Sequence, residues 1–422
     1  MATQTLSTFD ALLKNVYRGP IVELLNQNTY MIDQLEKTNA NNLGTFSGRQ
    51  LMFPVHTARN RGRGAVTDGG TLPTAGKQSA LDGIVTMNQF GAGIEITHQT
   101  ILQSKTDEGS FVRALTYEMD GAATDMRKDI NRIAFGTGDG LLASVLASTN
   151  STVISVDSGQ YIAIGDTVDV LTRTNGTSKV SAVAVTGVSF TGSADSSTQT
   201  NANITLASAA NVTNADGVYI SGDRSNESAG LRNITSTGRV LFQIDSSSNP
   251  IWDGNVVDAA NSAISEDLMI QLAQQIKQRT GTDIDTYVTS LGVQRRLARQ
   301  YTSQKRWNDD HVLQQSGGYS TVMIAAGNTG VPVIADTDAP YGFAFALNKS
   351  SFAWAEGSKP DWLSSPDGNG QVLHLKDGST AGTKVATWQA WMYWPATLVT
   401  VAANRNGQVK NLNDNVPVVR DQ

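Results

Sequence analysis

The sequence has no cysteine among its 422 residues, which excludes disulfide frameworks, zinc fingers, iron–sulfur sites and thiol nucleophiles. It has no run of about 18 apolar residues, so no segment predicts a membrane-spanning helix. Its N-terminus, MATQTLSTFDALLKNVYRG, lacks the basic start and the apolar centre of a signal peptide. The four histidines stand alone, outside the spacings at which histidines share a metal ion.

The chain also has no excess of positive charge, and this affects how its one arginine cluster is interpreted. The net charge is −6 and the pI is about 5.3, whereas proteins that coat nucleic acid are usually basic. The stretch TARNRGRGAVTDGG, residues 57–70, places Arg59, Arg61 and Arg63 among small residues, as in arginine–glycine tracts that bind RNA. On an acidic chain, such a local cluster argues against a nucleic-acid coat.

No constellation of residues predicts an active site. There is no G-x-S-x-G elbow, and GGTLPTAGK at 69–77 departs from a phosphate-binding loop because Gln78 replaces the metal-binding Ser or Thr. Asp336 and Asp338 before Pro340 are typical of a turn, since the further oxygens of a calcium site are missing. The chain is long enough for two or three folded domains. We therefore expect neither an enzyme nor a metal or cofactor protein, but one that contacts copies of itself.

The first 103 residues form two segments that bury too little on their own. Residues 1–43 carry two short helical pieces, with apolar sides formed by Phe9, Leu12, Leu13 and Val16, and by Leu24, Leu25, Met31, Ile32 and Leu35. In residues 44–103, extended segments at 50–56, 83–87 and 93–97 flank a polar, glycine-rich middle, which predicts a long two-stranded hairpin. Because both segments lack a core, we expect them to become ordered only against sister molecules.

The rest of the chain predicts one long helix and two folded regions. Apolar residues spaced by threes and fours predict a helix over 104–135, with Ser104 and Asp107 at its start and Glu118 and Asp125 among its polar residues. Sparse charge and alternating valines predict a small β-barrel or β-sandwich over 141–230. A mixed α/β region follows, with a helix headed by Ser265, a strand at 286–289, a helix from Ser290, and strands at 321–324, 331–335, 342–347 and 387–401.

The order of these parts resembles the major capsid protein of tailed bacterial viruses, of the Hong Kong 97 type. Three stretches carry the resemblance: GVPVIADTDAPYGFAFALNKSSFAWA (330–355), WQAWMYWPATLVTVAANRNG (388–407) and SEDLMIQLAQQIKQRTGTDIDTYVTSLGVQRRLARQ (265–300). The resemblance implies an α+β, Hong Kong 97-like phage capsid fold. Its implied parts are an N-terminal arm (1–43), an extended loop (44–103), a P-domain spine helix (104–140), an inserted β-domain (141–230), a P-domain strand region (231–260), an A-domain (261–390) and a closing strand with a C-terminal tail (391–422).

The resemblance also implies a function and a set of partners. The chain would form the pentamers and hexamers of an icosahedral shell that encloses double-stranded DNA without sequence specificity and matures by expansion. Because the N-terminal arm is short, a separate scaffolding protein is implied and N-terminal cleavage is not. A portal protein is the next implied partner, and a cement protein is a further candidate. The expected location is the virion capsid, assembled in the host bacterial cytoplasm without a membrane.

The resemblance implies contact residues, but no catalytic, cofactor-binding or metal residue. The extended loop of one subunit would lie over its neighbour, with Arg59, Arg61 and Arg63 meeting Glu118 and Asp125 of the neighbour's spine helix. A solvated loop tip is the alternative for these arginines.

Three other functions stay open. An encapsulin-like nanocompartment shares the fold, although its chains are usually shorter and lack such an insertion. A secreted β-rich surface protein would explain the Ser, Thr and Asn content, but not the long helix or the missing signal. An enzyme with an unfamiliar site predicts a monomer on a sizing column, whereas a shell protein predicts large particles.

Overall fold

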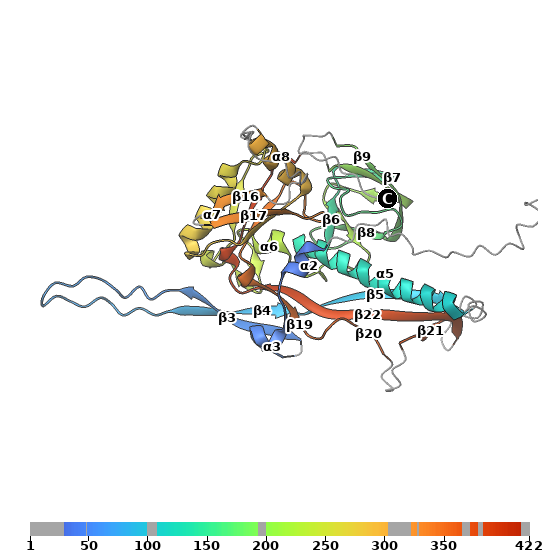
Figure 1. Ribbon diagram of the computed structural model, residues 1–422, viewed down its shortest axis with the longest axis horizontal. Coiled ribbons are helices and arrows are strands. Elements are labelled where there is room, and N and C mark those ends of the chain that lie inside the picture. The colour runs from blue at the N-terminus through green and yellow to red at the C-terminus, as the bar shows by residue number, and fades with distance from the viewer. Residues whose placement is uncertain are drawn as a thin grey trace, which may run out of the picture.

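A computed structural model describes residues 29–47, 49–98, 108–192, 200–302, 322–326, 329–364, 372–378 and 383–414. These residues form five β-sheets around one long helix, α5 (Glu108–Phe135). Figure 1 shows α5 lying along a long sheet, with two further sheets on the same side of that sheet as the helix and a hairpin projecting from one end. The described part of the chain thus combines helices and strands, as predicted, and strands predominate in it.

The central sheet is organised by β22 (Lys384–Thr400), a strand of 17 residues. Along one edge β22 pairs antiparallel with β5 (Asn88–Thr97) from Thr387 to Ala396. Along its other edge it pairs in succession with three shorter strands, β21 (His374–Asp377), β20 (Asp361–Trp362) and β19 (Phe352–Glu356). A parallel strand, β1 (Lys37–Asn39), then adds to β19.

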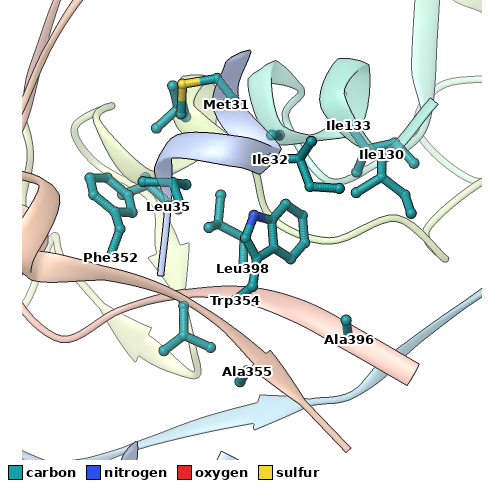
Figure 2. Packing of buried hydrophobic residues seen from close by; sticks show 14 of the residues in the cluster. Met31, Ile32, Leu35, Ile130, Ile133, Phe352, Trp354, Ala355, Ala396 and Leu398 are labelled. Atoms are coloured by element: carbon teal, nitrogen blue, oxygen red, sulfur yellow. The ribbon is translucent and has the colours of Figure 1, made fainter. Parts of the chain in front are cut away.

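The described part of the N-terminal arm packs on its own chain, which corrects one expectation. It forms α2 (Tyr30–Gln34), β1 and α3 (Ala40–Leu43), and it inserts Met31, Ile32 and Leu35 into the main hydrophobic core. These three side chains are at most 4% exposed, and they surround Trp354 together with residues of α5 and β22 (Figure 2). The prediction that residues 29–43 need a sister molecule is therefore wrong, because an intrachain core stabilises this short helix. The first helical piece and Leu24 and Leu25 lie outside the described residues.

The predicted hairpin is present, but with two strands instead of the three expected segments. It consists of β3 (Gln50–Ala58) and β4 (Ser79–Thr86), with β2 (Thr45–Phe46) at its base. The third segment became β5 and pairs with β22 instead. Leu51, Phe53 and Val85 alternate onto one face and are buried in the main core. The base of the hairpin is thus ordered by its own chain, and only the loop 59–78 extends beyond the last strand pair.

The long helix ends as the sequence predicts. It stops at Phe135, and Gly138 and Gly140 follow with φ of +86° and +80°, a conformation that side-chain-bearing residues avoid. Met126, Ile130 and Ile133 of the predicted stripe are buried in the main core, while the predicted start at Ser104 and Asp107 lies outside the described residues. No described helix has the length and apolarity needed to cross a membrane.

Residues 141–220 form a separate antiparallel sheet with its own core. The strand order is β6 (Leu141–Ser144), β11 (Asp216–Ile220), β8 (Thr167–Thr172), β9 (Ser178–Phe190), β10 (Ala202–Val212) and β7 (Thr149–Val156). A bridge between Val145 and Val156 joins the two outer strands, so that the sheet closes as a barrel. Alternating valines and isoleucines fill its interior, which explains why the sequence alternates there.

The last large sheet contains the mixed α/β region. Its strand order is β14 (Asn255–Asp258), β23 (Gly407–Lys410), β18 (Ala344–Leu347), β15 (Thr286–Thr289), β17 (Thr329–Ala335) and β16 (Val322–Ala326). Helix α7 (Glu266–Thr280) begins at its predicted cap, where Ser265 Oγ accepts a hydrogen bond from the Leu268 amide at 3.2 Å. It ends at Gly281, whose φ is +73°. Helix α8 (Leu291–Thr302) follows Ser290, as predicted.

Sheet membership does not follow the expected domain ranges near 261–390. Strands β19, β20 and β21 lie in the central sheet, although they fall inside the range expected for the A-domain. Conversely, β14 and β23 belong to the sheet of β15, although they fall outside that range. The remaining elements are short. The strands β12 (Val240–Leu241) and β13 (Ile244–Asp245) pair as a two-stranded sheet, and the helical turns are α6 (Leu231–Ile234), η2 (Pro250–Trp252), η3 (Lys349–Ser351) and η4 (Ala403–Arg405).

Candidate assembly surfaces

The three predicted contact arginines lie in the loop 59–78 that joins β3 and β4. The side chains of Arg59, Arg61 and Arg63 are all exposed, and none has a hydrogen-bond or ion-pair partner in the part of the chain that the structure describes. The two sides of the loop approach closely at Gly62, where a Cβ atom would lie only 2.4 Å from the Gly76 amide nitrogen. This close approach is possible because residue 62 has no side chain. The small residues therefore allow the two sides of the loop to lie close together, and the three arginine side chains remain available to bind a partner.

The predicted acceptors lie elsewhere in the molecule. Glu118 and Asp125 are exposed on α5, whereas the hairpin projects from the opposite end of the central sheet (Figure 1). The structure thus does not bring the arginines and these carboxylates together within one chain. A contact between them requires a second copy.

Asp125 lines an acidic cavity between α5 and β5. The cavity has a volume of about 350 Å³, and Asp129, Asp223 and Arg132 also line it. Arg132 Nη2 pairs with Glu227 Oε1 at 2.7 Å, and its Nε lies 3.8 Å from Asp129 Oδ1. One guanidinium group therefore faces several carboxylates, which leaves the cavity with an excess of negative charge.

Burial shifts the titration of one of these carboxyl groups. It raises the pKa of Asp223 to about 6, with the negative charge of Glu227 as the next cause. Asp223 therefore gains its charge at a mildly acidic pH.

Replacing Asp223 with asparagine is expected to stabilise the protein at pH 7 but not at pH 4. The folded carboxyl has a pKa of about 6, above that of an unfolded aspartate, so Asp223 lowers stability increasingly as pH rises from about 4 to 6. Because Asp223 is partly solvated, we expect a gain of about 1–2 kcal/mol at pH 7, less than the full shift implies. Urea unfolding of both proteins between pH 4 and pH 8 measures this. The exposed Asp68→Asn is the control, and a gain independent of pH would contradict the assignment.

A buried polar junction joins the arm, the long helix and the last sheet. The side chain of Asn131 on α5 is fully buried, and its Oδ1 accepts hydrogen bonds from the Met31 and Ile32 amides at 3.0 and 3.3 Å. Its Nδ2 donates to Asp338 Oδ2 at 2.8 Å and, at 3.3 Å, to the carboxylate of Asp336. The amide of Asn131 therefore caps α2 and satisfies two buried carboxylates at the same time.

Further contacts extend this junction to the barrel. Lys128 Nζ forms an ion pair with Asp338 Oδ2 at 2.8 Å, and Tyr161 Oη donates to the Asp338 carbonyl at 2.8 Å. Gln160 Nε2 donates to the Ala339 carbonyl at 2.9 Å. The pair Asp336 and Asp338 does lie at a turn, as predicted, but both side chains are buried. Among the described residues, no group of three or more His, Asp or Glu side chains could hold a metal ion.

Comparisons with known proteins concern the fold. No protein-family model matches the chain, and no curated protein matches it in sequence. In structure it is similar to a chain of the cyanophage A-1(L) capsid, with a TM-score of 0.61, 13% identity, and coverage of 97% of this chain and 100% of that one. It also matches a chain of Mycobacterium phage Adephagia (TM-score 0.48, 11% identity, coverage 97% and 98%). A third match is the encapsulin of Synechococcus elongatus (TM-score 0.45, 8% identity, coverage 100% of both chains).

Of these three similarities, only the first has a TM-score above 0.5, and it extends over nearly the whole of both chains. The elements predicted from the three quoted stretches are present in the described residues: α7, β15 and α8, then β17 and β18, then β22. The chain therefore has the fold of that chain of the cyanophage capsid.

Proposed function

We propose that this protein is the major capsid protein of a tailed phage. Its copies form an icosahedral shell of pentamers and hexamers in the host cytoplasm, with a scaffolding protein and a portal protein as partners. The shell encloses double-stranded DNA and expands as it matures. The observation that carries the proposal is the fold shared with the cyanophage capsid subunit over 97% of this chain. The barrel of residues 141–220 is the inserted domain within this proposal.

The hairpin supplies the proposed contact between neighbouring subunits. Arg59, Arg61 and Arg63 of one subunit lie against the acidic side of a neighbour's α5, at Glu118 and Asp125. Three exposed cations without partners and an acidic cavity support this contact by charge complementarity. Backbone pairing adds to it, because β2 pairs with β3 only at Leu51 and Met52 and leaves the outer edge of β3 beyond Met52 without a strand among the described residues.

Charge reversal at the loop tests the contact. We expect Arg61→Glu combined with Arg63→Glu to lower the yield of closed shells at least about tenfold, because unfavourable charge pairs cost several kcal/mol at an interface. Folding is expected to stay unchanged because both side chains are exposed. Electron microscopy and sedimentation of the chain expressed with its scaffolding partner measure the yield. The matched control is Lys179→Glu with Arg295→Glu, two exposed sites that undergo the same change of charge.

Compensation makes this test specific. Adding Glu118→Lys and Asp125→Lys to the loop variant is expected to restore shells, since the proposed pairs are then reversed and not broken. An undiminished yield of shells in the loop variant would contradict the proposed contact but not the proposed shell. A wild-type chain that stays monomeric with its scaffolding partner would contradict the proposed capsid function. Nuclease-protected DNA inside the particles supports a virus head, whereas an enclosed protein cargo would indicate a nanocompartment.

A further inference from the structure

The short hairpin β12–β13 has a turn whose backbone conformation does not suit its residues. Leu241 pairs with Ile244, so only two residues form the turn. These residues are Phe242 and Gln243, and their φ angles are +53° and +63°. Two-residue turns with positive φ at both positions favour Asn and Gly, because larger side chains are strained in this conformation. The turn of Phe242 and Gln243 is therefore strained.

The stem of this short hairpin is anchored in the body of the protein. Trp252 is buried, and its Nε1 donates a hydrogen bond to the Leu241 carbonyl at 3.2 Å. At the end of the stem, the Ser246 amide donates to the Arg239 carbonyl at 2.9 Å, and the Arg239 amide donates to Ser246 Oγ at 2.8 Å. The Arg239 guanidinium also forms an ion pair with Asp253. These contacts hold the stem without using any group of the turn itself.

The turn contacts the base of the extended hairpin β3–β4. The Phe242 carbonyl accepts a hydrogen bond from the Ile84 amide of β4 at 2.9 Å. The Phe242 ring packs edge-on against that of Phe53 on β3, with centroids 6.1 Å apart. The Phe53 ring lies across Gly83, where a Cβ atom would be 2.8 Å from Phe53 Cζ. Among the described residues, the bond from Ile84 to Phe242 is the one main-chain hydrogen bond between β3 or β4 and an element outside their own sheet.

We propose that Phe242 and Gln243 form a latch, which holds the angle of the extended hairpin when closed and releases it when the turn relaxes. Strained conformations persist only where surrounding contacts enforce them, and they are common in segments that switch. Here the extended hairpin supplies those contacts, through Ile84 and Phe53. Relaxation of the turn would move Phe242 away from both, and displacement of the hairpin would remove what maintains the strain. The two events favour each other, so the latch has a closed and an open state.

The residues of the latch set the balance between these two states. Phe242 is half-buried and its ring contact favours the closed state, whereas Gln243 is exposed and no packing explains its place in the turn. Because the open state is free of strain, the side chain at position 243 raises its population. This inference concerns a single chain and does not rest on the proposed function, so the two can fail separately.

Hydrogen exchange of the Ile84 amide in the dilute full-length chain measures opening, because this amide donates to the Phe242 carbonyl. Gln243→Gly removes the strain at one turn residue and is expected to slow this exchange about three- to tenfold. Ala182→Gly is the matched control: Ala182 is also exposed and has a φ of +49°, but it lies on β9 of the barrel, so the Ile84 exchange should not change. No slowing in Gln243→Gly overturns the proposal, and so does equal slowing in both variants.

Distances between two spin labels show whether the latch sets the hairpin angle. The chain has no native cysteine, so Asp82→Cys on β4 and Ser248→Cys beside the stem, both exposed, can be labelled specifically. Phe242→Ala removes the ring contact but keeps a side chain at positive φ, and it is expected to broaden the distance distribution at least about twofold. Val240→Ala, which changes a side chain that is 65% exposed on the same short hairpin, should leave the distribution unchanged. Equal distributions in these two variants would show that the hairpin angle does not depend on the latch.

Discussion

Replacing Trp354 with alanine is expected to lower the free energy of unfolding by about 3–5 kcal/mol. Trp354 is fully buried where the arm, the long helix and the central sheet meet, and Met31, Ile32 and Leu398 surround it (Figure 2). Its ring also packs on that of Trp394, with centroids 5.7 Å apart. Alanine would leave a cavity that three separate elements would have to fill together, so we expect little relaxation.

Chemical denaturation measures this loss, and the chain offers a matched control. Trp391 lies on β22, but it is 41% exposed, so Trp391→Ala should change stability by no more than about 1 kcal/mol. The indole N–H of Trp354 has no partner among the described residues, so Trp354→Phe should lose less than the alanine variant. Similar losses for Trp354→Ala and Trp391→Ala would show that the arm does not pack on Trp354 as described.

Replacing Asn131 with aspartate is expected to destabilise the protein by about 3–5 kcal/mol at neutral pH, although the two side chains have the same shape. The Nδ2 donors to Asp336 and Asp338 would be lost, and a third carboxylate would stand beside two buried ones. Burial already raises the pKa of Asp336. The new carboxyl should likewise have a raised pKa in the folded state, so its destabilising effect grows as pH rises above about 4.

Unfolding measured at pH 5 and at pH 8 checks both the size and the sign of this effect. The loss relative to wild type should be larger at pH 8, where the added carboxyl must be charged. Asn41→Asp introduces the same change at an exposed position of α3 and should alter stability by less than about 0.5 kcal/mol. A loss that is equal at both pH values would mean that lost packing, and not charge, dominates.

Local signals explain which elements were predictable from the sequence. The limits of α7 follow from Ser265 and Gly281, which lie next to the helix that they cap. The strand β15 and the end of α5 are likewise encoded within a few residues. Alternation predicted β5 as a strand but gave it the wrong partner, because a pattern of period two states which face is buried and not which strand lies beside it.

Long-range contacts explain which residues of the candidate surfaces could not be predicted from the sequence. Asn131 and Asp338 are 207 residues apart, and neither has an unusual neighbour in sequence. The available signal was an asparagine one turn before Ala134 and Phe135, on the buried side of a helix, where a polar side chain needs partners. The exposure of the arginine cluster and of Asp125 agrees with their local sequence, while the contact between them stays a prediction. Asp223 joins Asp125 at the acidic cavity only through the fold.

The pairing of β22 has a mechanical consequence. One edge of this strand pairs with β5 from Thr387 to Ala396, and the other edge pairs in succession with β21, β20 and β19, so the stretch from Trp388 to Ala396 is held on both sides. Ladder hydrogen bonds run across the strand direction, and tension along β22 therefore loads them in shear, many at once. Tension applied along the long axis of the subunit would be carried by this strand, while the barrel and the last sheet would move with it and bear little of the load.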